Sequence, residues 1–380
     1  MEKLSLGVVG TSRKPDEHRL PIHPAHLGQI DPELRRRMFL EQNYGQRFGV
    51  SDDELGRLVG GIWSREQLLE ECDVVVLPKP LAEDLAALRP GRVLWGWPHC
   101  VQDEALTQIA IDRHLTLIAW EAMNHWTHDG NFSLHVFHKN NELAGYCSVL
   151  HALQLIGTTG AYGRRLTAAV ISFGATARGA VTALFALGVH EVNVLTHRSV
   201  PAVAAPMAPA RLVHYERDPE HPHRTLALHS YGDRSMAEFL AEHDIVVNCV
   251  LQDTDNPLMF VTRDELELFT PGSVFIDVSC DQGMGFEWAR STSFADPLFS
   301  VAPGVRYYAV DHSPAYLWSS ATWEISEALL PFLETVMSGR DAWEANQTIR
   351  RAIEIRAGAV QNPKILSFQS RSPEFPHLKL

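Results

Sequence analysis

Short apolar runs rich in β-branched residues alternate along the chain with segments whose apolar positions recur at helical spacing. Residues 4–9, 72–77, 92–97 and 115–120 are predicted strands, and 103–113 is a predicted helix. Fully apolar strands that alternate with helices are typical of a largely parallel α/β sheet. The pattern therefore predicts an α/β fold for the first third of the chain.

The pattern restarts after residues 141–157, which we expect to form a long helix joining two domains. A strand from Ala168, a glycine turn, a helix and a second strand follow, with further strands at 244–250 and 273–278. At about 100 to 200 residues per domain, 380 residues are enough for two domains. Residues 201–231 are interpreted as a surface excursion without periodicity, and residues 342–356 as helical. The tail from 367 to 380 is expected to be draped or frayed.

Composition and charge limit the classes of function that the protein can have. Lys and Arg number 33 against 46 Asp and Glu, and the net charge of −13 disfavours binding to nucleic acid or to anionic membranes. No run approaches the roughly 20 apolar residues of a membrane span, and the N-terminus does not resemble a signal peptide. Five widely spaced cysteines without a C-x-x-C pair fit reduced thiols, so we expect a cytoplasmic location.

The turn after the strand that begins at Ala168 has the spacing of a dinucleotide-binding fingerprint, with serine in place of the first glycine. Such a turn lets the backbone approach a pyrophosphate at a helix N-terminus. Taken alone it is equally compatible with a purely structural turn. The residues expected to bind the cofactor here are Ser172, Gly174, Ala175, Thr176, Ala177 and Gly179.

The next strand ends in Thr196, His197 and Arg198, where an NAD site would place an acid for the ribose hydroxyl. An arginine without that acid favours the 2′-phosphate of NADP(H) over NAD(H). The alternative is that Arg198 simply faces solvent. Val250, at the end of a later predicted strand, completes the expected cofactor-binding set.

Three motifs in the first 100 residues place cations or an imidazole near predicted strand ends, where open α/β sheets bind ligands. They contain Arg19 (EHRLP), Lys79 (LPKP) and His99 (WGWPH). Each residue taken singly has an ordinary structural interpretation, as a surface ion pair, a solvated lysine or a core histidine.

Together, and in this order, the motifs resemble the alanine dehydrogenase and pyridine-nucleotide transhydrogenase superfamily. The resemblance continues through Ala119-Trp120-Glu121, Asn141-Glu142-Leu143-Ala144-Gly145-Tyr146 and Asp277-Val278-Ser279-Cys280-Asp281-Gln282-Gly283. It implies two Rossmann-like doubly wound domains with a cleft between them. Residues 1–138 with 313–380 would form the substrate domain, and residues 139–312 the NADP(H)-binding domain.

Within this superfamily, the Trp-Gly-Trp-Pro-His stretch and the arginine after the second strand resemble N5-(carboxyethyl)ornithine synthase. The Val310-Asp311-His312-Ser313-Pro314 segment resembles lysine-forming saccharopine dehydrogenase. Both families reductively join a 2-oxo acid to the amine of an amino acid, which implies the same reaction here. Alternatives are an alanine-type dehydrogenase that uses ammonia, a non-catalytic dinucleotide sensor and, less favoured, a methyltransferase.

That chemistry needs groups that move protons beside the reacting carbon, and Lys79 and His99 are the expected acid and base, in either order. Arg19 would hold a substrate carboxylate. Glu121 and Asp281 would tune the cations or bind the amine, and Asp311 would accept from the second substrate's ammonium. The partners expected are a small amino acid and a 2-oxo acid, with a homo-oligomer compatible. No metal is expected, because the spacing of His125, His128, His135 and His138 lacks a zinc-site pattern.

Overall fold

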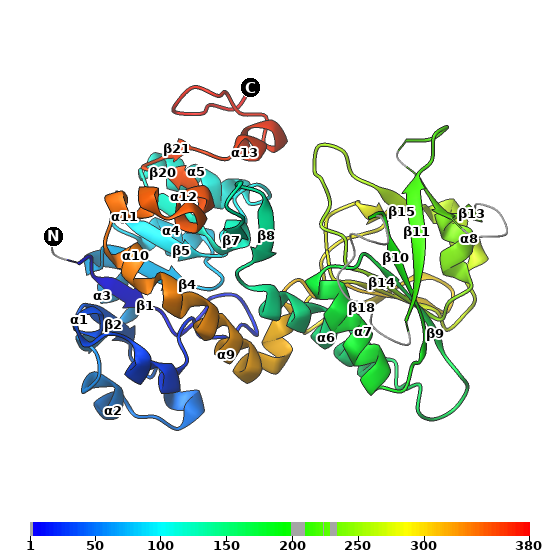
Figure 1. Ribbon diagram of the computed structural model, residues 1–380, viewed down its shortest axis with the longest axis horizontal. Helices are drawn as coiled ribbons and strands as arrows, with labels where there is room; N and C mark the ends of the chain where they lie inside the picture. The colour runs from blue at the N-terminus through cyan, green and yellow to red at the C-terminus, as the bar shows by residue number, and fades with distance from the viewer. Residues whose placement is uncertain (1–2, 199–209, 223, 229–233) are drawn as a thin grey trace. The chain divides into compact units, whose positions relative to one another are not determined.

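The computed structural model describes residues 3–198, 210–222, 224–228 and 234–380, and the chain forms two compact units. Unit 1 comprises Met1–Phe137 and Trp318–Leu380, and unit 2 comprises His138–Leu317. In Figure 1, unit 1 carries the blue, cyan and orange-to-red segments, and unit 2 the green and yellow ones. Both units are α/β with mainly parallel sheets, which confirms the predicted fold class.

The sheet of unit 1 has six parallel strands in the order β3-β2-β1-β4-β5-β6, the order of a doubly wound dinucleotide-binding fold. Two antiparallel strands from the C-terminal segment, β20 and β21, extend it beyond β6. The strands are β1 (Leu6–Val8), β2 (Met38–Glu41), β3 (Gly61–Trp63), β4 (Val74–Leu77), β5 (Val93–Gly96), β6 (Thr116–Ala119), β20 (Ile353–Arg356) and β21 (Ala359–Val360).

Side chains alternate between the two faces of this sheet, and helices cover both. Val75 and Leu77 join the core on the face covered by α3 (Arg65–Glu71), α4 (Ala82–Ala87) and α5 (Glu104–Asp112). Val74 and Val76 join the core on the opposite face. That face is covered by α9 (Trp318–Leu329), α10 (Leu333–Met337) and α12 (Gln347–Ala352). Burial on both sides explains why β4 is continuously apolar.

Smaller elements complete unit 1. They are α1 (Pro32–Arg35), α2 (Asp52–Gly56), α11 (Arg340–Ala345), α13 (Pro363–Phe368), the hairpin strands β7 (Asn124–Trp126) and β8 (Phe132–His135), and the 3₁₀ segments η1 (Pro24–Gln29), η2 (Gln46–Phe48), η3 (Trp120–Ala122) and η7 (Leu330–Phe332).

Unit 2 repeats the same strand order. Its parallel strands run β11-β10-β9-β14-β16-β19, and β12, β13 and β18 add antiparallel edges. The strands are β9 (Thr167–Ile171), β10 (Glu191–Thr196), β11 (Arg211–Arg217), β12 (Thr225–Leu228), β13 (Arg234–Ser235), β14 (Ile245–Asn248), β16 (Val274–Asp277), β18 (Leu298–Ala302) and β19 (Val305–Tyr308). A separate pair is formed by β15 (Met259–Val261) and β17 (Gly285–Phe286).

Two glycines let α6 (His138–Leu155) pack directly on α7 (Ala175–Ala186). A Cβ at Gly145 would lie 1.9 Å from the Thr176 carbonyl oxygen, and one at Gly179 would lie 1.7 Å from that of Glu142. Any larger side chain would push the helices apart. The other helices in the described part of unit 2 are α8 (Met236–Ala241), η5 (Arg263–Leu268) and η6 (Ser313–Leu317).

Three expectations about local structure are corrected. The excursion at 201–231 contains β11 and β12 in its described part, with Tyr215 and Ala227 buried; residues 201–209, 223 and 229–231 lie outside the described residues. Residues 353–356 form a strand, not the end of a helix. Of the two alternatives for the tail, draped or frayed, the frayed one is wrong, because buried Gln369 donates from Nε2 to the Cys100 carbonyl oxygen at 2.7 Å. No helix in the described ranges has the length and hydropathy to cross a bilayer.

Candidate active site

Three parallel strands of unit 1 end at the same edge of the sheet and deliver three polar side chains there. β4 leads to Lys79, β5 to His99, and β6 to Glu121. Pro78 and Pro80 flank Lys79, and the fixed φ of proline limits the conformations open to this short loop. The carboxyl edge of a parallel sheet is where open α/β folds bind ligands, so this edge is the candidate site in unit 1.

Lys79 and His99 are in direct contact. The Lys79 Nζ and His99 Nε2 atoms are 2.7 Å apart. An ammonium group can only donate, so a charged Lys79 requires a neutral ring that accepts at Nε2 and carries its proton on Nδ1. That Nδ1 lies 3.8 Å from Oε1 of Glu121. Lys79 and His99 therefore form a short path along which a proton can move, and Glu121 lies beside it, beyond direct hydrogen-bond distance of the His99 ring.

The backbone of His99 is held in an unfavourable conformation. Its φ is +49°, in the left-handed region, which costs on the order of 1–3 kcal/mol for a non-glycine residue. Its N–H donates to Oε1 of Glu121 at 2.6 Å. This hydrogen bond offsets part of the strain and helps to hold His99 in its conformation.

Arg19 joins this cluster through Trp97. The guanidinium carbon is 5.1 Å from the centroid of the Trp97 ring, and Lys79 Nζ is 5.9 Å from the same ring. Arg19 is buried, and its Nε and Nη2 donate to the two oxygens of Glu17 at 2.8 and 2.5 Å. The structure thus brings together the three residues named from separate motifs. Glu17 was missed as a functional residue, although a buried arginine needs such a partner.

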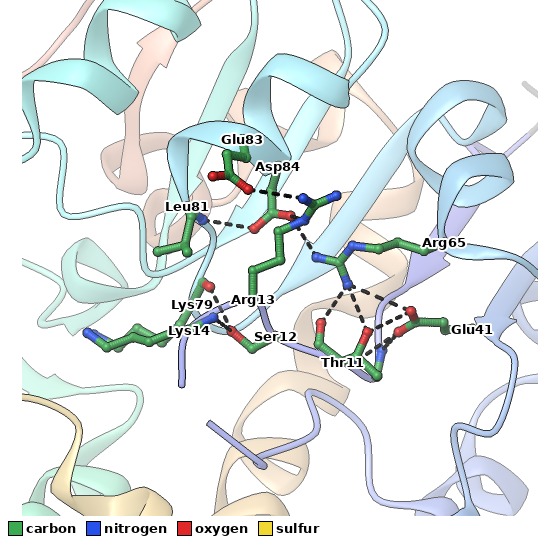
Figure 2. A network of polar contacts seen from close by, with 11 residues as sticks. Thr11, Ser12, Arg13, Lys14, Glu41, Arg65, Lys79, Leu81, Glu83 and Asp84 are labelled. Carbon is green, nitrogen blue, oxygen red and sulfur yellow. Dashed lines mark hydrogen bonds and ion pairs between the residues drawn. The ribbon is translucent and has the colours of Figure 1, made fainter. Parts of the chain in front are cut away.

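The loop after β1 lies at the point where the strand order reverses, between β1 and β4, and it contacts the main chain of Lys79. Ser12 Oγ donates to the Lys79 carbonyl oxygen at 3.2 Å and accepts from the Lys14 N–H at 3.1 Å (Figure 2). Because Ser12 and Lys79 come from adjacent strands, this bond fixes the two loops to each other.

A network of buried carboxylates and arginines anchors that same loop (Figure 2). Glu41, 6% exposed, accepts from the N–H groups of Gly10 and Thr11, each at 2.7 Å. Asp84, 1% exposed, accepts from Arg65 Nη2 at 2.7 Å and lies 3.0 Å from Arg13 Nε. These contacts make the loop a rigid support for Ser12.

We expect Ser12→Ala to lower kcat about 3- to 10-fold, the equivalent of one hydrogen bond of roughly 0.5–1.5 kcal/mol, with little change in cofactor binding. The loss arises because the Lys79 main chain is held less firmly. Steady-state kinetics measure it, with exposed Ser300→Ala as the control. An unchanged kcat in Ser12→Ala would show that the hydrogen bond does not position Lys79.

Glu121 lies in an environment that disfavours its charge. Burial and the nearby Glu354 carboxylate raise the pKa of Glu121 to about 8, against the opposing effects of backbone hydrogen bonds and of Lys79. A carboxyl group that is largely neutral at pH 7 can hold a proton at the end of the Lys79–His99 path.

In unit 2 the turn between β9 and α7 keeps a glycine-like backbone despite its serine. Ser172 has a φ of +95°, in the left-handed region where the fingerprint has glycine. Gly174 precedes α7, no side chain of the described residues caps this helix, and a Cβ built on Gly174 would meet only Ser172 Oγ, at 3.9 Å. The first N–H groups of the helix, from Ala175, Thr176 and Ala177, are thus available to an anion, so the turn fits a pyrophosphate.

The end of β10 presents basic groups and, across residues 196–198, no carboxylate. Thr196 is buried and its Oγ1 accepts from the Arg198 N–H at 3.1 Å, while His197 and Arg198 are exposed. Partial desolvation of its ring and the positive charges of Arg198 and His214 lower the pKa of His197. A phosphate placed here would meet a positive environment.

The remaining predicted site residues also lie in unit 2, whereas the Lys79 cluster belongs to unit 1. Val250 follows β14 and its carbonyl oxygen accepts from Ser279 Oγ at 2.6 Å. Asp281 follows Cys280, whose N–H donates to buried Asp277. Asp311 is 2.6 Å from Nδ1 of its neighbour His312. In the ranges described, no group of three or more metal-binding side chains gathers.

Asp277 was overlooked although it organises the loop that carries Asp281. Its Oδ1 accepts from the N–H groups of Ser279 and Cys280 at 3.1 and 3.2 Å, and Tyr307 donates to Oδ2 at 2.7 Å. Burial raises the pKa of Asp277 to about 6. The signal that could have identified Asp277 is an acidic residue at the end of a buried apolar strand.

Two doubly wound units, one with the Lys79–His99 contact at its strand ends and one with a glycine-type turn before a helix, are the architecture of two-domain dehydrogenases. Sequence models of the alanine dehydrogenase/PNT family match the chain twice, the N-terminal domain at residues 8–144 and the C-terminal domain at 168–363. The chain belongs to this family of pyridine nucleotide-binding dehydrogenases, as its motifs predicted, and it is an oxidoreductase.

Individual relatives agree with this assignment. N(5)-(carboxyethyl)ornithine synthase of Clostridium botulinum is 22% identical over 83% of this chain and 89% of its own. Alanine dehydrogenase of Mycobacterium tuberculosis is 25% identical over 94% and 95%. Among solved structures, an L-alanine dehydrogenase superposes with a TM-score of 0.73 at 19% identity, covering 96% of this chain and 99% of that one. A transhydrogenase from Sinorhizobium meliloti gives 0.69 at 20%, covering 94% and 99%.

Proposed function

We propose that the protein uses NADPH to join a 2-oxo acid to the amine of an ornithine- or lysine-like amino acid, through an imine, giving an opine-type secondary amine. The observation that carries this proposal is the Arg19–Trp97–Lys79–His99 cluster, which combines a carboxylate-binding cation with a proton-transfer pair. The first relative named above supports the substrate class.

Each residue has a defined task in this reaction. Loss of water from the carbinolamine needs a proton, and deprotonation of the attacking amine releases one; Lys79 and His99 exchange both. Arg19 holds the carboxylate of the 2-oxo acid, which fixes the imine carbon. Glu121 tunes the pair, and Asp281 and Asp311 bind the amino acid's ammonium. The nicotinamide supplies the hydride.

The second candidate is an alanine-type dehydrogenase, in which ammonia replaces the amino acid. This candidate is favoured by the alanine dehydrogenase of Mycobacterium tuberculosis, which aligns with nearly the whole chain. The same cluster of side chains could carry out the proton transfers of that reaction. Asp311 favours the first candidate, because ammonia needs no additional carboxylate.

A matrix of NADPH oxidation assays tests the proposal. Pyruvate and 2-oxoglutarate are each combined with ornithine, lysine or ammonia, and product mass is measured. The proposal requires oxidation that depends on the basic amino acid and a product carrying both carbon skeletons. Oxidation with ammonia alone that gains nothing from ornithine or lysine contradicts it and supports the second candidate. We place the reaction in the cytoplasm, on the five free cysteines.

NADP(H) preference is tested at Arg198. We expect Arg198→Ala to raise KM for NADPH about 10- to 100-fold, since a charged hydrogen bond to the 2′-phosphate is worth roughly 1.5–3 kcal/mol, and to leave KM for NADH unchanged. Steady-state kinetics with both cofactors measure this. Arg165→Ala, at an exposed arginine paired with Glu191, is the control. An equal rise in KM for NADPH and NADH would contradict the assignment of Arg198 to the 2′-phosphate.

A further inference from the structure

An irregularity in the sheet of unit 1 lies at Glu354. In the antiparallel pairing of β20 with β6, Ile353 faces Ile118 and Ile355 faces Leu117, so Glu354 is an extra residue in the register. Ile353, Glu354 and Ile355 are all buried, which breaks the usual alternation of faces. Bulges of this kind redirect a side chain and are frequent beside active sites.

The Glu354 carboxyl is only partly satisfied where it lies. The residue is 6% exposed, and its Oε1 accepts from Asn362 Nδ2 at 3.0 Å. Its Oε2 is buried and has no hydrogen-bond partner among the described residues. The buried thiol of Cys100, the residue after His99, interacts with this carboxyl. An ionised carboxylate in such a place costs several kcal/mol, so its presence needs a reason.

The carboxyl group of Glu121, which follows the neighbouring strand β6, is also only partly hydrogen-bonded. Its Oε1 accepts from the His99 N–H, but its Oε2 is buried without a partner in the part of the chain that the structure describes. The pairing of Ile353 with Ile118 places Glu354 beside the end of the strand that leads to Glu121, and burial raises the pKa of both carboxyl groups. Lys79 opposes this at Glu121, and the Nε2 atom of His135 lies 3.2 Å from the Glu121 carbonyl oxygen. Two like charges in one buried space cannot both form readily.

We propose that Glu121 and Glu354 form a carboxyl pair that holds one proton at the end of the Lys79–His99 path, and that Glu354 is a positioning residue that sets the charge Glu121 presents to His99. This inference rests on the proposed role of Lys79 and His99 as the acid–base pair. The proton moves between existing groups, so no further reactant is needed.

Titration of the Glu121 carboxyl tests the pair directly. The protein without substrate or cofactor is labelled with ¹³C at glutamate carboxyl carbons, and the Glu121 resonance is assigned by its loss in Glu121→Gln. The wild type is expected to titrate near pH 8. In Glu354→Gln the midpoint is expected to fall by about one pH unit or more, because the like charge is gone. The amide oxygen of this variant can still accept from Asn362, so the fold is preserved.

Glu344→Gln is the matched control, since it removes a half-exposed carboxylate of α11 that pairs with Arg356 and should leave the Glu121 midpoint in place. A midpoint in Glu354→Gln within a few tenths of the wild-type value, in protein with native circular dichroism, would overturn the proposal. If Glu354→Gln does not fold, Glu354→Asp, which withdraws the carboxyl by one methylene, must lower the midpoint instead. The titration uses no substrate, so its outcome is separate from that of the assay matrix.

Discussion

Lys79→Met is expected to lower kcat/KM about 1,000-fold while leaving the affinity for the dinucleotide unchanged. Methionine keeps the length of the side chain but cannot donate to His99 Nε2, now 2.7 Å from the ammonium. General acid–base groups contribute roughly 10²- to 10⁴-fold, and here both members of the pair lose their partner. Steady-state kinetics measure the turnover, and thermal shift with NADPH measures binding, which the proposal assigns to residues of unit 2.

Lys364→Met, on the exposed surface of α13, serves as the control for removing one lysine. Its kinetics should match the wild type. A Lys79→Met variant that retains more than about a tenth of the activity would exclude Lys79 from proton transfer.

Arg19→Met is expected to reduce the free energy of unfolding of unit 1 by about 3–5 kcal/mol, apart from any loss of substrate binding. The reason is Glu17, whose side chain is fully buried and would lose the guanidinium that balances its charge. Denaturation by urea, followed by tryptophan fluorescence, measures the change. The double variant Glu17→Gln/Arg19→Met should recover part of the loss, because no uncompensated charge remains.

The control for this experiment is Lys3→Met, which breaks the more exposed Lys3–Glu334 ion pair of the same unit. With side-chain exposures of 30% and 75%, that pair is worth less than about 1 kcal/mol. If Arg19→Met costs no more than Lys3→Met, the Glu17–Arg19 pair is not the buried interaction described above.

The doubly wound core was predictable because its strands carry a strong local signal. Residues 74–77 read Val-Val-Val-Leu, and helices on both faces require that composition. β20 was missed for the opposite reason: Ile-Glu-Ile-Arg directly follows a helix, and its partner β6 is more than 200 positions earlier. Pairing between strands so far apart cannot be detected from the pattern of a short stretch of sequence.

The candidate site also contains some residues that the sequence predicts and others that it does not. Lys79, His99 and Glu121 could be named because each follows a strand, and parallel strands end at one edge. Their supporting groups could not, since Glu41, Asp84 and Glu354 come from different elements and resemble ordinary surface acids in sequence. Burial distinguishes them, and burial depends on the assembled fold.

The division of unit 1 between the two ends of the chain has a consequence for biosynthesis. Residues 138–317 interrupt it, and β20 reaches β6 only when the last tenth of the polypeptide has been translated. Unit 2, which is continuous, can mature while the ribosome is still at work. A prematurely terminated product would therefore retain the dinucleotide turn but lack Glu354, and it could hold a nucleotide without a complete catalytic centre.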